Sequence, residues 1–151
     1  MSTSRRPIYG GKHQRNLDSK NRLTIPSKWR FDGDTEAVYL ALPDPSGCIL
    51  VLPPKQVDKL YEQIESQQLS DEDAQDFQDA FFSQAVSFGC DKQGRINLPE
   101  ELLSHSGIAK EAVIIGRMTS FRIWSGEKWE SKDPKANNND DMSKLMKRVN
   151  L

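Results

Sequence analysis

The sequence has 151 residues, of which 36% are hydrophobic and 28% charged, and its formal net charge is -1. This composition is typical of a globular protein with room for one domain or two very small ones, and it excludes a fibrous or membrane-spanning chain. A net charge near zero also argues against a protein that coats nucleic acid through charge alone. Because no apolar stretch follows the first arginines, no secretory signal is predicted, and we expect a cytoplasmic protein with no membrane partner.

Charge is distributed unevenly along the chain. Residues 1–30 contain eight basic residues and the single acid Asp18, a balance of +7. Residues 56–79 reverse this balance, with eight acids against the single base Lys59. The two signs should therefore lie on opposite faces or ends of the fold, and the basic N-terminal region suits a negatively charged ligand.

A short motif occurs twice, at an offset of 73 residues. Residues 18–26 read DSKNRLTIP and residues 91–99 read DKQGRINLP. Aspartate, arginine and proline recur in register, and two apolar residues alternate with polar ones after each arginine: Leu23 and Ile25, Ile96 and Leu98. This alternation predicts a half-buried strand in each copy, with Thr24 and Asn97 facing outward. The chain is thus a tandem repeat of one small β-rich unit.

The elements around the motif are predicted in the same order in both copies. A strand, a tight turn and the half-buried strand come first, and a short helical turn and two further strands follow. The helical turns are expected at 27–30 and 100–104, and the later strands at 36–41, 48–52, 111–116 and 121–124. The predicted fold class is therefore α+β and mainly β.

A helical connector separates the two copies. Val57, Leu60, Tyr61 and Ile64 follow the spacing of one apolar helix face. A second helix from about residue 70 is expected to turn a further apolar face inward: Ala74, Phe77 and Phe81. We expect an N-terminal extension at 1–9, a first unit at 10–57, the connector at 58–83, a second unit at 84–129 and a mobile tail at 130–151.

In each copy three polar residues separate the aspartate from the arginine, which is the composition of a hairpin tip. Asp18 and Asp91 can accept hydrogen bonds from the N–H groups of the turn, so we expect them to organise it. Asn21 and Gly94 occupy the position that needs a positive φ, which glycine and then asparagine tolerate best.

Two interpretations of Arg22 and Arg95 remain open. Each arginine can pair with the aspartate of its own turn and simply hold the turn together. Alternatively, the two hairpins can present a basic edge to a DNA groove, where arginine reaches guanine through two hydrogen bonds and lysine holds phosphate. Lys12 and Arg15, just before the first copy, favour the second interpretation and make copy one the better candidate for DNA.

The two motifs resemble the repeated hairpin signature of the MraZ family, and the likeness extends over nearly all of residues 8–129. It includes FFS at 81–83 and IWS at 123–125. The resemblance implies two SpoVT-AbrB units, folded together in one chain as a pseudo-dimeric swapped-hairpin β-barrel with flanking helices. It also implies a bacterial transcription regulator that binds short promoter repeats upstream of the division and cell-wall gene cluster, including its own gene, and that assembles into rings.

The resemblance also assigns site residues. The signature arginine of the family falls on Arg22 and Arg95, and the turn lysines fall on Lys20 and Lys92. Together with the two flanking basic residues, the positions expected to contact double-stranded DNA are Lys12, Arg15, Lys20, Arg22, Lys92 and Arg95.

Two positions depart from the family pattern. Gly10 stands where the family has a basic residue near the start, and Asn21 stands where it has its first signature glycine. The neighbouring Lys12 or Arg15 can replace the missing charge.

No catalytic, metal or cofactor site is predicted, and no small-molecule substrate. The two histidines, His13 and His105, are isolated, and the two cysteines, Cys48 and Cys90, stand apart in apolar contexts. No nucleophile-elbow, phosphate-loop or zinc spacing occurs.

The main alternative is an oligomeric protein-interaction module related to the AbrB-like antitoxins, whose contact surface would be the acidic connector together with four aromatic residues: Trp29, Tyr61, Phe77 and Trp129. The spacing of Trp29, Tyr61, Phe77 and Trp129 favours ordinary core instead. A homo-oligomer is expected for the DNA-binding protein, because one chain offers a single basic edge and repeated DNA sites let weak contacts add. Such a protein would be associated with the nucleoid.

Overall fold

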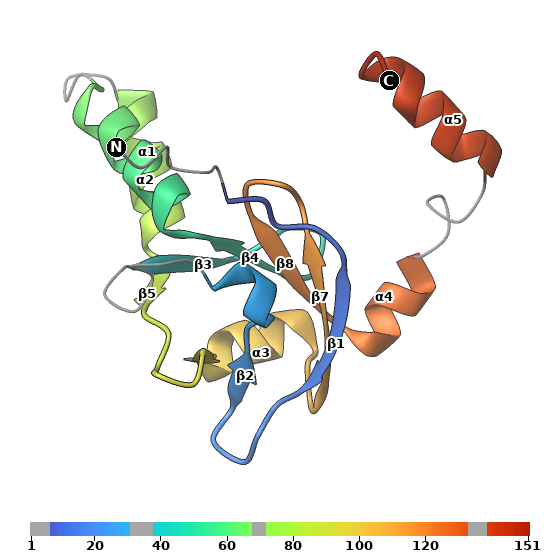
Figure 1. Ribbon diagram of the computed structural model, residues 1–151. Coiled ribbons are helices and arrows are strands. Elements are labelled where there is room, and N and C mark those ends of the chain that lie inside the picture. Colours follow the sequence, from blue (N-terminus) through green and yellow to red (C-terminus); the bar gives the residue numbers. More distant parts are fainter. Residues whose placement is uncertain (1–6, 31–37, 68–71, 133–138) are drawn as a thin grey trace, which may run out of the picture.

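The computed structural model describes residues 7–30, 38–67, 72–132 and 139–151 (Figure 1). Arg5 and Arg6 of the basic flank, and the first two residues of the strand expected at 36–41, lie outside these ranges. Among the described residues, no helix combines the length and the apolar character needed to cross a membrane.

The first copy follows the predicted order of elements. Its motif turn lies between β1 (Lys12–Asn16) and β2 (Arg22–Thr24). The single 3-10 turn η1 (Ser27–Trp29) follows Pro26, and β3 (Tyr39–Pro43) and β4 (Ile49–Leu52) complete the copy. Proline suits this junction because it cannot donate to a strand ladder but has the φ of a helix start.

The second copy repeats this order. Its elements are β5 (Val86–Phe88), β6 (Arg95–Asn97), α3 (Glu100–Ser106), β7 (Glu111–Gly116) and β8 (Phe121–Ser125). Gly107 ends α3 at a φ of 73°, and its N–H donates to the carbonyl of Leu103 at 2.8 Å. This left-handed helix end is a role that glycine fills without steric cost.

The two copies are interleaved in a single sheet. Within the described residues, six strands pair antiparallel in the order β1-β7-β8-β4-β3-β5. Exchanging each strand for its counterpart in the other copy (β1 for β5, β3 for β7, β4 for β8) reverses this order onto itself. The sheet therefore has a pseudo-twofold axis, and strands of each copy complete the pairing of the other.

The second motif strands lie on the same axis. β2 and β6 form a two-stranded ribbon in which Leu23 opposes Ile96, Arg22 opposes Asn97 and Thr24 opposes Arg95. Leu23 and Ile96 are fully buried, whereas Thr24 and Asn97 are exposed, as the alternation predicted. With β1 and β5 at its two edges, the larger sheet is open, and no pairing among the described residues closes it into the single barrel that the resemblance implies.

One hydrophobic core contains residues of both copies and of both sheets. The buried ring of Trp29 lies at its centre, 5.6 Å from the ring of Tyr9 and 5.1 Å from that of Phe121 between centroids. Burying a large side chain contributes roughly 1.5–3 kcal/mol. This packing fixes η1 and the start of the chain against the sheet.

The connector consists of α1 (Pro54–Glu65) and α2 (Glu72–Phe82), which project together from one side of the sheet (Figure 1). Neither helix contains a fully buried residue. The expectation of ordinary core is right for Trp29 but wrong for Tyr61 and Phe77, which are 67% and 48% exposed. The helical spacing of these residues fixes only which face they share; it does not tell whether another element covers that face.

Two further helices follow β8. α4 (Gly126–Lys132) packs on β7 and β8, and its half-buried Trp129 lies 6.1 Å from Trp124 between ring centroids. α5 (Asn139–Arg148) occupies part of the segment 130–151, for which the sequence predicted no regular structure. That prediction is wrong for these residues, because the helical spacing of their few apolar side chains is obscured by neighbouring Asn and Asp, which are typical of turns.

Candidate nucleic-acid interface

The first motif turn is closed by the side chain of Asp18. Its Oδ1 accepts hydrogen bonds from the backbone N–H groups of Lys20 and Arg22, both at 2.9 Å, and its Oδ2 accepts one from the Arg22 Nε at 2.6 Å. The Asp18 backbone N–H donates to the carbonyl of Arg22 at 3.0 Å. One carboxylate thus ties both ends of the turn together.

The second turn repeats this arrangement atom by atom. The Asp91 Oδ1 accepts from the N–H groups of Gln93 at 2.9 Å and Arg95 at 2.8 Å, and its Oδ2 accepts from the Arg95 Nε at 2.8 Å. Two turns 73 residues apart in the sequence therefore share one geometry.

These contacts favour the charged form of each aspartate. Hydrogen bonds from the backbone and side chain of Arg22 lower the pKa of Asp18, and those from Arg95 lower the pKa of Asp91. Both carboxylates are therefore ionised at neutral pH and neutralise part of the arginine charge within each turn.

Asn21 and Gly94 hold equivalent places in the two turns. Both take the left-handed conformation, with φ values of 60° and 78°. Glycine takes it without steric cost, and asparagine is among the few other residues that adopt it routinely. The departure of Asn21 from the family pattern therefore leaves the shape of the first turn unchanged.

The antiparallel pairing of β2 with β6 places the two turns at opposite ends of one short ribbon, because Arg22, just after the first turn, opposes Asn97, and Arg95, just after the second turn, opposes Thr24. The Ile25 N–H donates to the Gly94 carbonyl at 2.8 Å, and in the symmetric contact the Leu98 N–H donates to the Asn21 carbonyl at 3.0 Å. Each turn is thus hydrogen-bonded to the residue that follows the strand leaving the other turn, and the ribbon joins the two turns into one unit.

Both motif arginines lie on the outer face of this ribbon, opposite the buried Leu23 and Ile96, and each is paired through Nε alone. The side chains of Arg22 and Arg95 are 27% and 28% exposed, and their terminal nitrogens make no other hydrogen bond among the described residues. The turn-holding pairing that the sequence suggested is therefore present in both copies. It leaves one edge of each guanidinium available to a ligand, so it does not exclude the second interpretation.

The two turn lysines, Lys20 and Lys92, are exposed but do not occupy equivalent positions. The N–H of Lys20 donates to its aspartate as that of Gln93 does in the second turn, so Lys92 corresponds to Ser19. The two turns therefore share one backbone geometry but carry their lysines at different positions.

Lys12 and Arg15 lie on β1, away from the turns. Lys12 is exposed, and the half-buried Arg15 donates from Nη1 to the Gln14 carbonyl at 2.8 Å. At about 3.4 Å per residue they precede Asp18 by roughly 20 and 10 Å along the chain. Odd spacing also places them on opposite faces of the strand, so the structure does not bring these two residues into one cluster with the turns.

Arg30, which the sequence placed only within the basic flank, crosses from the first copy to the second turn. Its Nη1 donates to the Gln93 carbonyl at 3.2 Å, and a Cβ on Gly94 would lie only 2.6 Å from its Cδ. The corresponding residue of the second copy is Leu103, so only the second turn gains this extra guanidinium. No local pattern signals the contact because its partners are 63 residues apart.

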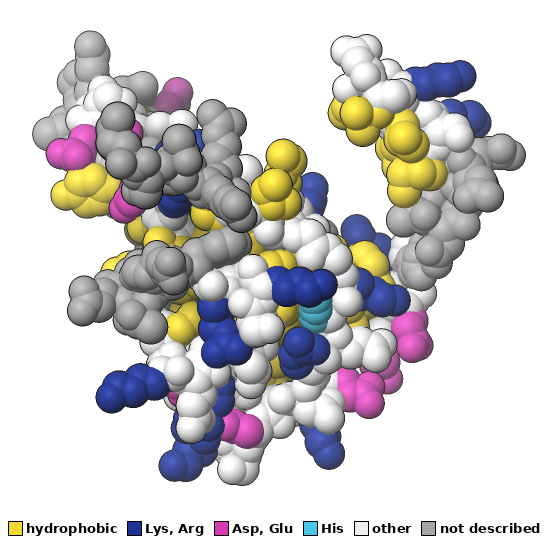
Figure 2. Space-filling view, in the orientation of Figure 1, with side chains coloured by type: hydrophobic (Ala, Val, Ile, Leu, Met, Phe, Trp, Pro, Cys, Tyr) yellow, Lys and Arg dark blue, Asp and Glu magenta, His cyan; other side chains and the backbone are white. Residues whose placement is uncertain are grey.

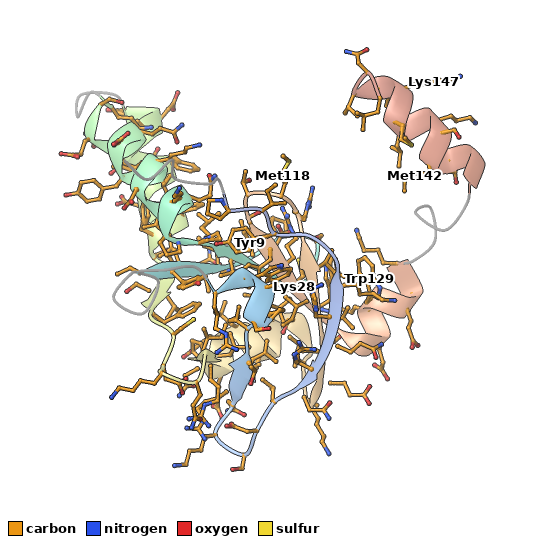
Figure 3. All side chains as sticks on the ribbon, in the orientation of Figure 1. Tyr9, Lys28, Met118, Trp129, Met142 and Lys147 are labelled. Carbon is orange, nitrogen blue, oxygen red and sulfur yellow. The ribbon has the colours of Figure 1, made fainter. Side chains whose placement is uncertain are left out.

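The face that contains β1, η1 and the motif turns is rich in Lys and Arg side chains (Figure 2). Lys28 on η1, labelled in Figure 3, is exposed beside the buried Trp29. Basic side chains thus lie on the same face of the molecule as the motif turns.

The two histidines take part in packing. The His13 ring lies edge-on to Trp29 at 5.1 Å between centroids. The His105 Nε2 donates to the Asp44 carbonyl at 2.7 Å, next to the ion pair between Asp44 and Arg122. Neither histidine lies at the turns.

Two interleaved copies of one strand-turn-strand unit, with a paired set of basic turns on their shared ribbon, define a tandem-repeat binding protein. The chain belongs to the MraZ family. The family model, described as "MraZ protein, putative antitoxin-like", matches it twice, over residues 8–80 and 81–149. The two matches meet at residues 80 and 81, near the end of α2, and divide the chain between its two copies.

Several curated relatives match nearly the whole chain, and each is named transcriptional regulator MraZ. The proteins of Lactobacillus johnsonii and Lactobacillus gasseri are 33% and 34% identical over 145 residues, which is 95% of this chain and 100% of each relative. The protein of Lactobacillus delbrueckii subsp. bulgaricus is 36% identical over 135 residues, which is 89% of this chain and 92% of the relative.

Proposed function

We propose that the chain is a sequence-specific DNA-binding transcriptional regulator, not an enzyme, and that the two motif turns are its DNA-contacting edge. The observation that supports this most is the pairing of two equivalent basic turns on one two-stranded ribbon. A ribbon of this width fits the major groove of B-form DNA, where base edges differ for every base pair. The relatives, each named as a transcriptional regulator, agree with this role.

In this proposal the arginine and the aspartate of each turn have different roles. Arg22 and Arg95 contact bases or phosphates through their terminal nitrogens, while the bond from Nε to the aspartate holds the guanidinium in place. Asp18 and Asp91 organise the turns. A side chain that is already ordered loses less conformational entropy when the ligand binds.

The remaining basic residues hold phosphate groups. Lys20 and Lys92 do so at the turns, and Arg30 does so beside the second turn. Lys12 and Arg15 reach phosphate groups from opposite faces of β1, which is an edge strand of the sheet. Contacts of this kind orient the protein on DNA without reading its sequence.

The proposed targets are short promoter repeats of the division and cell-wall gene cluster, including the gene of the protein itself. A single chain offers one edge and few contacts, so we infer a homo-oligomer, in the form of a ring, that engages several repeats at once. We also infer that the sheet and the β2–β6 ribbon together wrap into a pseudo-dimeric barrel, since one core joins them. The protein would act in the cytoplasm, at the nucleoid.

The alternative is an oligomeric protein-interaction module related to AbrB-like antitoxins. The observation that favours it is the exposure of aromatic side chains on the acidic helices α1 and α2, a surface that DNA would repel. The two functions assign different surfaces to the partner, and they are therefore separable by experiment.

Footprinting on the region upstream of the protein's own gene, combined with equilibrium binding at several salt concentrations, tests the proposal. Regularly spaced protection at short repeats is expected. About five phosphate contacts per duplex would give a slope of log affinity against log salt near -4.5. Binding that ignores both salt and sequence, or no protection, would favour the protein-interaction module.

A further inference from the structure

A polar hollow lies between the edge strand β1 and the helix α4. Residues of β1, β7 and α4 line it, and Figure 3 shows Trp129 of α4 next to β1. Its volume is about 590 Å³, which lies within the range of pockets that hold small molecules in proteins. The motif turns, which lie elsewhere on the chain, make no use of it.

Charged side chains of both signs line this hollow. The bases are Lys12 and Arg15 of β1, and the acids are Glu111 of β7 and Glu130 of α4. None of these four belongs to an ion pair within the described part of the chain. Opposite charges that share a hollow without pairing suit a ligand whose own groups complement both signs.

Arg15 reaches the hollow around the open edge of β1. Gly11 and Leu17, at the two ends of this strand, are hydrogen-bonded to residues at the ends of β7, so the carbonyl of Gln14 points away from β7. The Arg15 Nη1 donates to that carbonyl at 2.8 Å. The guanidinium therefore covers an acceptor that an added peptide strand would need, and the hollow suits a small molecule better than a strand.

α4 contributes an aromatic ring and open space. The half-buried Trp129 ring lies beside Trp124, 6.1 Å away between centroids, and also lines the hollow. Gly126 lines it too, and a Cβ at this position would meet only Glu111, whose Oε2 would lie 3.5 Å away. The missing side chain of Gly126 thus leaves part of the hollow free.

We propose that this hollow binds a nucleoside monophosphate as a regulatory ligand. Lys12 and Arg15 hold its phosphate, since ammonium and guanidinium groups form charge-assisted hydrogen bonds with phosphate oxygens. The base stacks on the indole of Trp129, a contact that tolerates any base because each has a π-face. The two glutamates accept hydrogen bonds from the sugar hydroxyls and from the amino group of the base.

Occupation of the hollow should weaken DNA binding. Lys12 and Arg15 are also two of the proposed phosphate contacts, so the nucleotide and DNA compete for the same two cations. This consequence rests on the proposed function, whereas the site itself does not. Because each lost phosphate contact removes about 0.9 from the slope of log affinity against log salt, a saturating nucleotide should reduce that slope by about 1.8.

Isothermal titration calorimetry of the full chain without DNA tests the site. The probes are AMP, GMP, CMP and UMP, with adenosine and inorganic phosphate as partial ligands. At least one monophosphate should bind one-to-one. It should bind at least about 10-fold more tightly than either partial ligand, since each of these lacks one set of hydrogen bonds or contacts.

Variants locate the binding in the hollow. Gly126→Leu fills it without changing a charge, so this variant should lose nucleotide binding and keep the wild-type affinity for a promoter duplex. Glu127→Leu, at the next position of α4 and outside the hollow, is the matched control. Lys12→Ala, at an exposed position that the fold does not need, should weaken nucleotide binding by at least about 10-fold, whereas Lys59→Ala on α1 should not. Circular dichroism checks that all four remain folded.

Three outcomes would overturn the site: no monophosphate binds at millimolar concentration, inorganic phosphate binds as tightly as the nucleotides, or Gly126→Leu and Lys12→Ala both bind like the wild type. Binding of a short single-stranded oligonucleotide but of no free nucleotide would also overturn it, because the hollow would then hold a nucleic-acid strand. A bound nucleotide that leaves the salt slope of duplex binding unchanged would overturn the competition. A chain that binds the nucleotide but no duplex would refute the proposed function and leave the site in place.

Discussion

Replacing Arg22 with alanine is the most direct test of the proposed edge. The Arg22 Nε is held by the Asp18 Oδ2 at 2.6 Å, which leaves two terminal nitrogens to form the pair of hydrogen bonds that guanine accepts. Losing such a contact should cost about 1–3 kcal/mol of binding free energy, or roughly a 5- to 150-fold increase in Kd. The fold should persist, because a partly exposed ion pair contributes little to stability.

The pseudo-twofold axis adds a second measurement. Arg95 has the same geometry and the same exposure, so Arg95→Ala and the double variant complete a mutant cycle. If both arginines read bases, each single variant should lose discrimination between a promoter duplex and a scrambled one. If Arg95 holds only phosphate, its variant should weaken both duplexes equally and reduce the salt slope by about one.

Fluorescence anisotropy with labelled duplexes at several salt concentrations gives these values. Lys59→Ala, which removes one positive charge on α1 away from the turns, is the control. An unchanged affinity of folded Arg22→Ala would refute the assignment of this residue to DNA. Loss of the fold would instead support the interpretation in which the arginine only holds the turn.

Three further predictions concern stability and the second turn. A Cβ on Gly116 would lie 2.5 Å from the backbone of Tyr9, so Gly116→Ala should destabilise the fold by about 1–3 kcal/mol in chemical denaturation; an unchanged midpoint would contradict this close approach. The pKa values of Asp18 and Asp91 are lower in the folded state, so these carboxylates stabilise the protein above their ordinary pKa of 3.8, and that stabilisation should be lost as the pH falls through the folded values. Asp91→Asn should flatten this acid limb of the stability curve, and a curve identical to the wild type would argue against the shift. Arg30→Ala should reduce the salt slope of DNA binding by about one with no change in sequence preference, and an unaltered slope would remove it from the edge.

The motif turns are the part of the molecule that the sequence predicted most closely. Glycine or asparagine at a left-handed position, and strands whose residues alternate between buried and exposed, follow from the conformational limits of single residues. These local effects explain why the elements of both copies appear in the predicted order. They also explain why the backbone of the first turn tolerates Asn21.

The sequence did not predict whether other elements pack on the apolar faces of the helices. Tyr61 and Phe77 have the spacing of core residues, yet both are exposed, and α5 forms where no element was predicted. Spacing specifies which side chains share a face. Whether another element covers that face depends on where the rest of the chain lies.

The sequence by itself determined that one strand-turn-strand unit occurs twice and where its turns fall, because φ preferences and apolar alternation act within a few residues. Only the tertiary structure decided that β2 pairs with β6, and that Arg30 reaches the turn of the other copy. Backbone hydrogen bonds are the same for every residue, so two similar copies can pair within themselves or with each other without any change in local pattern. The burial of one shared core selects the interleaved arrangement, and that choice places the two basic turns at the two ends of one ribbon.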